Sequence, residues 1–298
     1  MGVKGYIMRL QPFSVNDGDG IRTTIFVAGC PCRCQWCSNP EGFTKAPLVG
    51  WYQQKCIGCK ACTQACPQNI GINMNLERDT CVACGKCVDA CPTKAREYLV
   101  RLMDADEILQ QIRRHGIFYR FSGGGISFSG GECTSQPELF NYLTKHIFDM
   151  GYSMDMETCG CFDFEVVRES LERMDLIFMD LKLMDDMKHR LYTGVSNKKT
   201  FENIKRLHEV PARVVIRIPI IGGVNDDAEN VRRSAAYVHE HLPKAKIELL
   251  PYHNFGTIKY EALGIPYQHQ EFYRLAKEDL ERLKEIIRSE GVEIADFT

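Results

Sequence analysis

The sequence predicts an α/β protein in which a parallel sheet forms a barrel or part of one, with a cysteine-rich segment inserted near the N-terminal side. Three observations lead to this prediction. Strand-like and helix-like segments alternate over the last 200 or so residues of the 298-residue chain, polar side chains follow several strands, and most of the 15 cysteines come before residue 92. Such alternation implies parallel strands joined by crossover helices.

The composition is ordinary apart from its cysteines. Hydrophobic residues make up 44% and charged residues 26%, and the net charge is −2. Without a basic surface or tail, nucleic acid and membrane surfaces are not expected partners. No apolar run approaches the ~18 residues that span a bilayer, and the start lacks a secretory signal. We therefore expect a cytoplasmic protein.

The cysteines indicate metal binding and not disulfides. The chain is long, has no secretory signal and gathers its cysteines in clusters, which is typical of metal ligands in a reducing compartment. An odd total also leaves no complete disulfide pairing. We therefore expect residues 1–47 and 99–298 to form the barrel and residues 48–98 to form a metal-binding insert.

The barrel elements follow from local patterns. Residues 5–13 and 22–29 are strand-like, and Asp104 with Glu107 resembles a capping box. The further expected elements are a helix from near Asp104, a strand at 125–132, a helix after Pro137, a strand at 152–158, a helix from Asp163, a strand at 176–182, a helix around Phe201–Glu209, a strand at 212–220, a helix from Asp226, a strand at 246–252, a helix at about 271–290 and a strand at 292–297.

Polar residues cluster where these strands end. They are Glu132, Glu157, Thr158, Asp180, Lys182, Arg217 and His253. In parallel barrels, chemistry collects at the C-terminal ends of the strands. Any one of these residues fits an ordinary polar loop position, but seven together predict a site.

The insert contains one motif twice. CIGCKACTQACP and CVACGKCVDACP both read C-x2-C-x2-C-x3-C-P, the bacterial run in which the fourth cysteine ligates the other of two [4Fe–4S] clusters. The expected sets are Cys56, Cys59, Cys62 with Cys91, and Cys81, Cys84, Cys87 with Cys66. Zinc, the alternative, usually takes pairs of ligands separated by a longer span. The motif predicts electron transfer without specifying the reaction.

The first cysteine cluster, VAGCPCRCQWCSNPE, has a different spacing. Cys30, Cys34 and Cys37 form C-x3-C-x2-C, which resembles the radical S-adenosylmethionine (SAM) superfamily. The resemblance implies that these cysteines hold three irons of a [4Fe–4S] cluster and leave the fourth iron for SAM. Cys32 is interpreted as a bystander. Trp36 is expected to pack against the adenine, with core packing as the alternative.

A second motif, SFSGGE, supports this resemblance. In radical SAM enzymes the stretch matching Gly130, Gly131 and Glu132 binds the amino group of SAM. Glycine allows close backbone approach to a ligand, and a carboxylate suits a cation.

Longer stretches narrow the family. SVNDGDGIRTTIFVAGCPCRCQWCSNPE, METCG, DLKLMD, YTGVSN and ELLPYHNFGTIKYEALG are similar to the activating enzymes of glycyl radical enzymes, of the pyruvate formate-lyase activase type. The insert is similar to the subgroup with a two-cluster, ferredoxin-like domain. The resemblance implies a partial (β/α)6 TIM-like barrel and three [4Fe–4S] clusters. It also implies that reduced flavodoxin or ferredoxin supplies an electron, that SAM yields a 5′-deoxyadenosyl radical, and that this radical removes a Cα hydrogen from a glycine of the partner enzyme.

The resemblance also assigns individual residues. Glu157, Thr158 and Asp180 match positions that hold a monovalent cation near the SAM carboxylate. Lys182 and Arg217 fit roles at that carboxylate or at the cleaved bond, with salt bridging as the alternative. His253 matches a residue that contacts adenosine, and a structural histidine is its alternative. Buried apolar roles are the default for the remaining cysteines, which are Cys133, Cys159 and Cys161.

Two other functions remain open from the sequence. One is radical SAM chemistry on a small molecule or another peptide. The other is an electron carrier without catalysis, which the insert alone would permit but which the three-cysteine motif and GGE disfavour.

Overall fold

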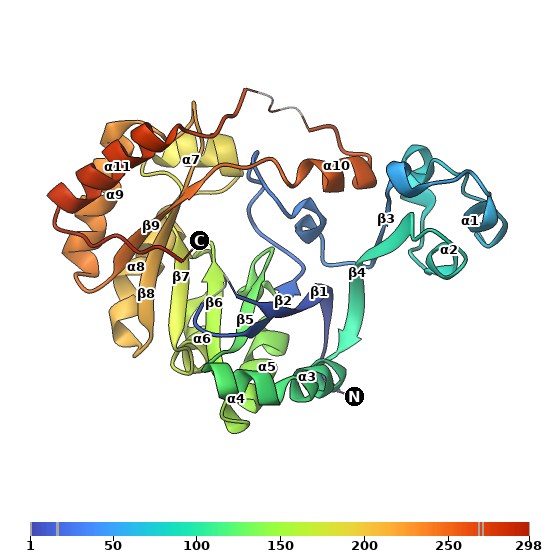
Figure 1. The fold of residues 1–298 in the computed structure, drawn as a ribbon, viewed down its shortest axis with the longest axis horizontal. Coiled ribbons are helices and arrows are strands. Elements are labelled where there is room, and N and C mark those ends of the chain that lie inside the picture. Colours follow the sequence, from blue (N-terminus) through green and yellow to red (C-terminus); the bar gives the residue numbers. More distant parts are fainter. Residues whose placement is uncertain (1, 16–17, 268, 270, 298) are drawn as a thin grey trace.

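The computed structural model describes residues 2–15, 18–267, 269 and 271–297. Within these residues, nine strands form one sheet in the order β3-β4-β1-β2-β5-β6-β7-β8-β9 (Figure 1). The strands are β1 Lys4–Ser14, β2 Arg22–Val27, β3 Leu48–Trp51, β4 Arg96–Asp104, β5 Gly125–Gly130, β6 Ser153–Thr158, β7 Leu176–Asp180, β8 Arg213–Ile220 and β9 Lys246–Pro251. From β2 through β5 to β9 the neighbours pair in parallel, and β1, β3 and β4 add antiparallel pairs. The sheet is therefore mostly parallel and consistent with a partial barrel.

Helices connect the parallel strands and cover the outside of the sheet (Figure 1). They are α3 Ala105–Arg114, α4 Gly116–Ser122, α5 Pro137–Asp149, α6 Phe164–Leu171, α8 Lys198–Arg206, α9 Ala228–His241 and α11 Lys277–Ser289. Two further helices, α7 Asp186–Thr193 and α10 Thr257–Leu263, contact the loop that follows β2. Among the described helices, none is long and apolar enough to cross a bilayer.

Aspartate caps begin three of the expected helices. The side chains of Asp104, Asp163 and Asp227 accept hydrogen bonds from backbone N–H groups in the first turns of α3, α6 and α9. Each such cap stabilises its helix by about 1 kcal/mol. These contacts confirm the helix starts expected near Asp104 and Asp163, and Asp227 stands one residue after the expected start.

The core lies between the sheet and its helices. Every residue of β2 is buried, and Phe128 of β5 packs edge-on against Phe140 of α5 with ring centroids 5.1 Å apart. Burying such side chains stabilises the fold by about 1.5–3 kcal/mol each. The apolar runs of the strands therefore fix the sheet, and the polar residues at the strand ends are left at its C-terminal edge.

Some expected elements differ from the structure. Residues 292–297 form no strand; Ile294 makes a single bridge to Ile247 of β9. The last helix begins at Lys277 and not near residue 271. The sequence interpretation also missed α4, α7 and α10, which have seven or eight residues each and are too short for a clear helical period.

Residues 48–98, the expected insert, lie at the antiparallel edge of the sheet (Figure 1). Strand β4 pairs with both β1 and β3, and the short helices α1 Ala61–Gln64 and α2 Lys86–Asp89 lie beyond β3 (Figure 1). The two cysteine blocks repeat in backbone conformation. Positive φ angles occur in pairs 25 residues apart, at Gly58 and Ala83, Lys60 and Gly85, and Asn69 and Lys94. The cysteines are offset by the same interval, so the repeated motif folds as two copies of one turn.

Candidate active site

The C-x3-C-x2-C motif lies on the loop that follows β2. Cys30, Cys34 and Cys37 are half-buried, and the Cys37 N–H donates to the Cys34 carbonyl at 3.0 Å. The Cys37 Sγ accepts a hydrogen bond from the Asn39 N–H at 3.4 Å. The Arg33 guanidinium donates to the carbonyl oxygens of Cys30 and Cys32, at 2.6 and 2.8 Å. Carbonyl oxygens of the loop therefore accept hydrogen bonds from donors within the same loop, and these bonds stabilise its conformation.

The thiols of this loop differ in acidity. Hydrogen bonds with the Cys159 and Cys32 thiols lower the pKa of Cys30 to about 3, and a hydrogen bond with Cys32 also lowers the pKa of Cys34. Burial raises the pKa of Cys37 to about 12. Because the thiolate is the form that binds metal, two of the three thiols are already biased toward ligation. The donor set fits an iron–sulfur cluster.

The two glycines of SFSGGE pack directly on this loop. Gly131 donates its N–H to the Val27 carbonyl at 2.9 Å. Gly130 has φ +122°, and a Cβ there would lie 2.3 Å from the Val27 oxygen. A Cβ on Gly131 would lie 2.5 Å from the Gly29 oxygen. The two glycines therefore allow β5 to pack closely against β2 and the cysteine loop.

Replacing Gly130 by alanine is expected to destabilise the fold by at least about 1–3 kcal/mol, from backbone strain and the clash with β2. The matched control is Gly123→Ala. Gly123 also has a positive φ, +69°, but no atom lies within 4 Å of its added Cβ. Chemical denaturation of both variants measures the difference. Equal losses would show that the contact between Gly130 and β2 is unimportant.

Glu132 is buried and its carboxylate faces the protein. One oxygen accepts from the Thr134 hydroxyl at 2.7 Å, and the other accepts from the Cys159 N–H at 2.8 Å. The Thr158 hydroxyl lies 2.9 Å from both oxygens. Burial raises the pKa of Glu132. Glu132 and Thr158 therefore join the ends of β5 and β6 into one hydrogen-bonded unit.

Arg217 connects two carboxylates across β6, β8 and β9. It donates to Glu157 at 2.5 Å and to Glu248 at 2.7 Å, and its guanidinium carbon lies 3.6 Å from the Phe178 ring centroid. Among the described residues, its buried Nη2 has no hydrogen-bond partner. A buried donor without an acceptor is costly, so this atom suits the carboxylate of a bound ligand.

Lys182 is the second buried cation at this edge. Its Nζ contacts the Asp180 carboxylate, and the residue is only 8% exposed. Burial alone lowers the pKa of Lys182, but Asp180 and the neighbouring Cys34 and Cys32 thiols together raise it well above its usual value. A permanently charged ammonium beside thiolates favours an anionic metal centre.

Trp36 and His253 occupy different environments. Trp36 is buried with Leu183, Tyr252 and other apolar side chains. His253 is exposed and stacks on Phe255 at 4.6 Å between ring centroids. The structure thus brings together the expected site residues on β5, β6, β7 and β8 and on the loop after β2. His253 lies outside this buried group.

Helix α10 packs against the cysteine loop, and the sequence did not predict this contact. Lys259 donates to the side chains of Asn39 and Glu41, each at 2.6 Å. A Cβ on Gly256 would lie 2.9 Å from Ser38 Cα, so the start of α10 packs against the loop. Glycine at that position is the signal that could have indicated this contact.

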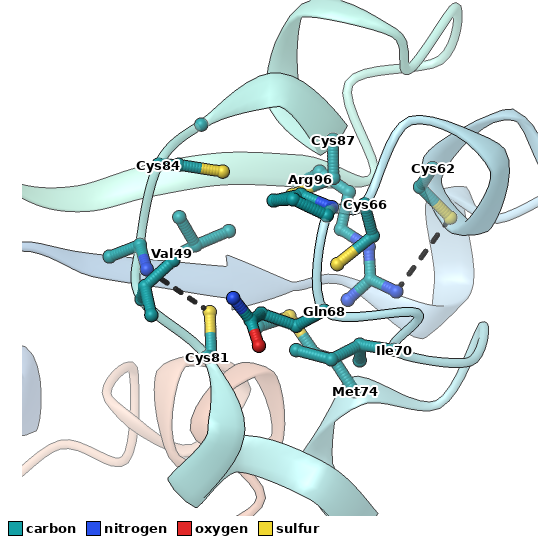
Figure 2. Close-up of a pocket in the computed structure, with 14 residues that line it drawn as sticks. Val49, Cys62, Cys66, Gln68, Ile70, Met74, Cys81, Cys84, Cys87 and Arg96 are labelled. Atoms are coloured by element: carbon teal, nitrogen blue, oxygen red, sulfur yellow. Dashed lines mark hydrogen bonds between the residues drawn. The ribbon is translucent and has the colours of Figure 1, made fainter.

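The eight insert cysteines line two neighbouring pockets. One is lined by Cys56, Cys59, Cys62 and Cys91, and the other by Cys66, Cys81, Cys84, Cys87 and also Cys62. Figure 2 shows the sulfur atoms of Cys66, Cys81 and Cys84 facing a common space, while Cys62 points toward Arg96. The lining residues coincide with the two ligand sets expected from sequence, with Cys62 shared.

Arg96 lies at both pockets. It is 3% exposed, and its Nη2 donates to the Ile72 carbonyl at 2.5 Å. The same Nη2 also donates to the Cys62 Sγ at 3.8 Å (Figure 2). The sequence offered no signal for this residue, because an arginine after a cysteine block reads as a surface cation.

Replacing Arg96 by methionine is expected to destabilise the insert by about 1–3 kcal/mol, since buried carbonyls lose their donor. Removing a cation should also lower the reduction potential of an adjacent cluster. Denaturation and an EPR-monitored redox titration measure the two effects. The control is Lys55→Met, which removes a partly exposed cation paired with Glu97 and should cost under about 1 kcal/mol. Equal losses of stability and equal changes in reduction potential in the two variants would contradict the role of Arg96 as a buried donor and cation beside the pockets.

Comparisons with known proteins show the family of the chain. Residues 24–235 match the radical SAM superfamily. The (2S)-3-sulfopropanediol dehydratase activating enzyme of Klebsiella oxytoca is 37% identical, over 89% of this chain and 87% of its own. The trans-4-hydroxy-L-proline dehydratase activating enzyme of Clostridioides difficile is also 37% identical, over 95% and 96%. The choline trimethylamine-lyase activating enzyme of Oleidesulfovibrio alaskensis is 36% identical, over 96% and 95%.

A solved structure supports the fold separately. A radical SAM methyltransferase from Sphaerobacter thermophilus has 15% identity and a TM-score of 0.55, covering 96% of this chain and 76% of its own. At that identity the likeness concerns the fold alone. The family model and the curated relatives lead to one conclusion: the chain belongs to the radical SAM superfamily, among the activating enzymes of glycyl radical enzymes.

Proposed function

We propose that this protein uses SAM and a [4Fe–4S] cluster to place a radical on a glycine of a partner glycyl radical enzyme. Cys30, Cys34 and Cys37 would hold this cluster, which would pass one electron from the external donor to SAM; the cleavage would give methionine and a 5′-deoxyadenosyl radical that takes a glycine Cα hydrogen to become 5′-deoxyadenosine. The observation that carries this proposal is the three-cysteine loop after β2, whose Cys30 and Cys34 thiols interact with the buried Lys182 ammonium.

The chain's own residues have separate tasks in this proposal. Cys30, Cys34 and Cys37 hold the cluster, and Lys182 balances its charge. Arg217 binds the SAM carboxylate through Nη2. Gly130, Gly131 and Glu132 shape the amino-group side, where the Glu132 carboxylate acts by fixing β5 and β6, since its oxygens already accept internal donors. Trp36 and His253 are proposed at the adenosine.

A monovalent cation beside Glu157, Thr158 and Asp180 stays a prediction. Glu157 pairs with Arg217 and Asp180 with Lys182, so a bound cation would compete with these ion pairs.

The insert, residues 48–98, is proposed as a ferredoxin-like domain with two [4Fe–4S] clusters, and residues 1–47 with 99–298 as the barrel. The two cysteine-lined pockets and the 25-residue backbone repeat support this division. Reduced flavodoxin or ferredoxin is the proposed electron donor. Three reduced iron–sulfur clusters suit a reducing, cytoplasmic setting.

The function is tested with anaerobically reconstituted protein, SAM, dithionite and a glycyl radical enzyme from the same genome neighbourhood. The expected results are 5′-deoxyadenosine and a glycyl EPR doublet on the partner. Deoxyadenosine without any doublet on such partners would favour a small-molecule or other peptide substrate. Absence of deoxyadenosine, with intact clusters, would overturn the radical SAM assignment.

A further inference from the structure

A second group of thiols lies beside the cysteine loop. The Sγ atoms of Cys30, Cys32 and Cys159 all lie within 4.8 Å of one another. The Cys161 thiol interacts with those of Cys32 and Cys159. Cys32 and Cys159 are buried and Cys161 is half-buried. Two of these four residues, Cys159 and Cys161, are outside the C-x3-C-x2-C motif, and Cys32 lies within it without being one of its three cysteines.

The backbone at these thiols is fixed by internal hydrogen bonds. The Cys159 N–H donates to Glu132, and its carbonyl accepts from the Thr200 hydroxyl at 2.9 Å. Gly160, at φ +75°, turns the chain so that Asn203 donates to its carbonyl at 2.8 Å. Arg33 fixes the carbonyls of Cys30 and Cys32. Ligands held this way need little ordering when a metal binds.

The separation suits a mononuclear thiolate site. With Zn–S bonds of about 2.3 Å, tetrahedral ligands lie about 3.8 Å apart. The Sγ atoms of Cys30, Cys32 and Cys159, which lie within 4.8 Å of one another, therefore require shifts of about 1 Å or less. Thiolates select soft or borderline ions such as zinc and ferrous iron. The buried Lys182 ammonium, which interacts with Cys32 and Cys159, offsets part of the charge of several thiolates.

We propose that Cys30, Cys32, Cys159 and Cys161 bind one thiophilic divalent metal ion in the cluster-free chain. This inference rests on the proposed function only in assigning Cys30 to the cluster. Because both centres need Cys30, a bound ion and the cluster exclude each other. The protein would therefore hold an ion here before assembly, and cluster formation would have to displace it.

Anaerobic titration of the cluster-free full chain with Co2+ tests the site. The insert cysteines also bind Co2+, so variants are compared with the wild type. Cys159→Ser should bind about one ion fewer per chain, with weaker thiolate-to-cobalt absorption, or bind that ion at least tenfold more weakly. The matched control is Cys133→Ser, which changes a fully buried thiol next to Glu132 and should bind as the wild type does. Equal stoichiometry and affinity in all three proteins would overturn the proposal.

A competition experiment covers the case in which a variant folds poorly without metal. Wild-type protein and Cys32→Ser are each preloaded with one equivalent of Zn2+ beyond the capacity of the insert. The wild type should then rebuild its first cluster several-fold more slowly than the variant, as measured by the SAM-dependent EPR signal. No zinc effect on that rate in either protein would also overturn it. Deoxyadenosine formation by the fully loaded wild type tests the proposed function separately, so the two can fail independently.

Discussion

Cys34→Ala is expected to abolish reductive SAM cleavage. Cys34 is a proposed cluster ligand and, unlike Cys30, is not shared with the second thiol group. Even changes to groups that only orient metal ligands cost about 10–100-fold, so loss of a ligand should lower deoxyadenosine formation by more than about 100-fold. Iron analysis should show loss of one cluster, about four irons of the roughly twelve that the three proposed clusters would hold.

The control for this variant is Cys133→Ala. Cys133 is fully buried and donates to the Glu157 carbonyl at 3.3 Å, so it tests the general effect of removing a buried thiol at this edge. It should retain the SAM-dependent EPR change that Cys34→Ala loses. Full iron content and normal SAM cleavage in Cys34→Ala would exclude Cys34 as a ligand.

Arg217→Met should destabilise the fold by about 3–5 kcal/mol, the usual cost of removing one partner of a buried ion pair. The variant leaves Glu248, which is 2% exposed, without its cation. It also removes the Nη2 donor, so the KM for SAM should rise. Thermal or chemical denaturation measures the first effect, and the SAM dependence of deoxyadenosine formation measures the second.

Arg213→Met is the matched control on the same strand. Arg213 pairs with Asp19 at the surface, and both side chains are more than half exposed, so its loss should cost under about 1 kcal/mol. Arg217→Lys keeps the charge and should recover part of the stability. Equal stability of the methionine variants at positions 213 and 217 would contradict the assigned role of the buried pair.

The sequence could predict the parallel elements because their apolar runs and aspartate caps are local signals. It also placed Glu132, Glu157, Asp180 and Arg217 at one edge, since strand ends follow from topology. It could not predict where these side chains point. Glu132 faces internal donors and not the open edge, which depends on Thr158 and Cys159 from the neighbouring strand.

For the same reason, the sequence could not predict contacts between residues that are far apart in the chain. Cys32 and Cys159 are 127 residues apart, and only the parallel pairing of β2, β5 and β6 brings their loops together. The brace from Lys259 to Glu41 spans 218 residues and rests on α10, whose seven residues gave no helical period. Spacing motifs reveal ligands within one loop but not those assembled from several.

Strand β4 has a consequence for electron movement. It leaves the insert, pairs with β3 over residues 96–100 and then with β1 over residues 101–104, and β1 pairs with β2 just before the cysteine loop. Hydrogen-bonded strand pairs thus fix the distance between the proposed auxiliary clusters and the proposed SAM site. Because tunnelling falls off exponentially with distance, such a connection would keep the transfer rate steady while the partner protein docks and leaves.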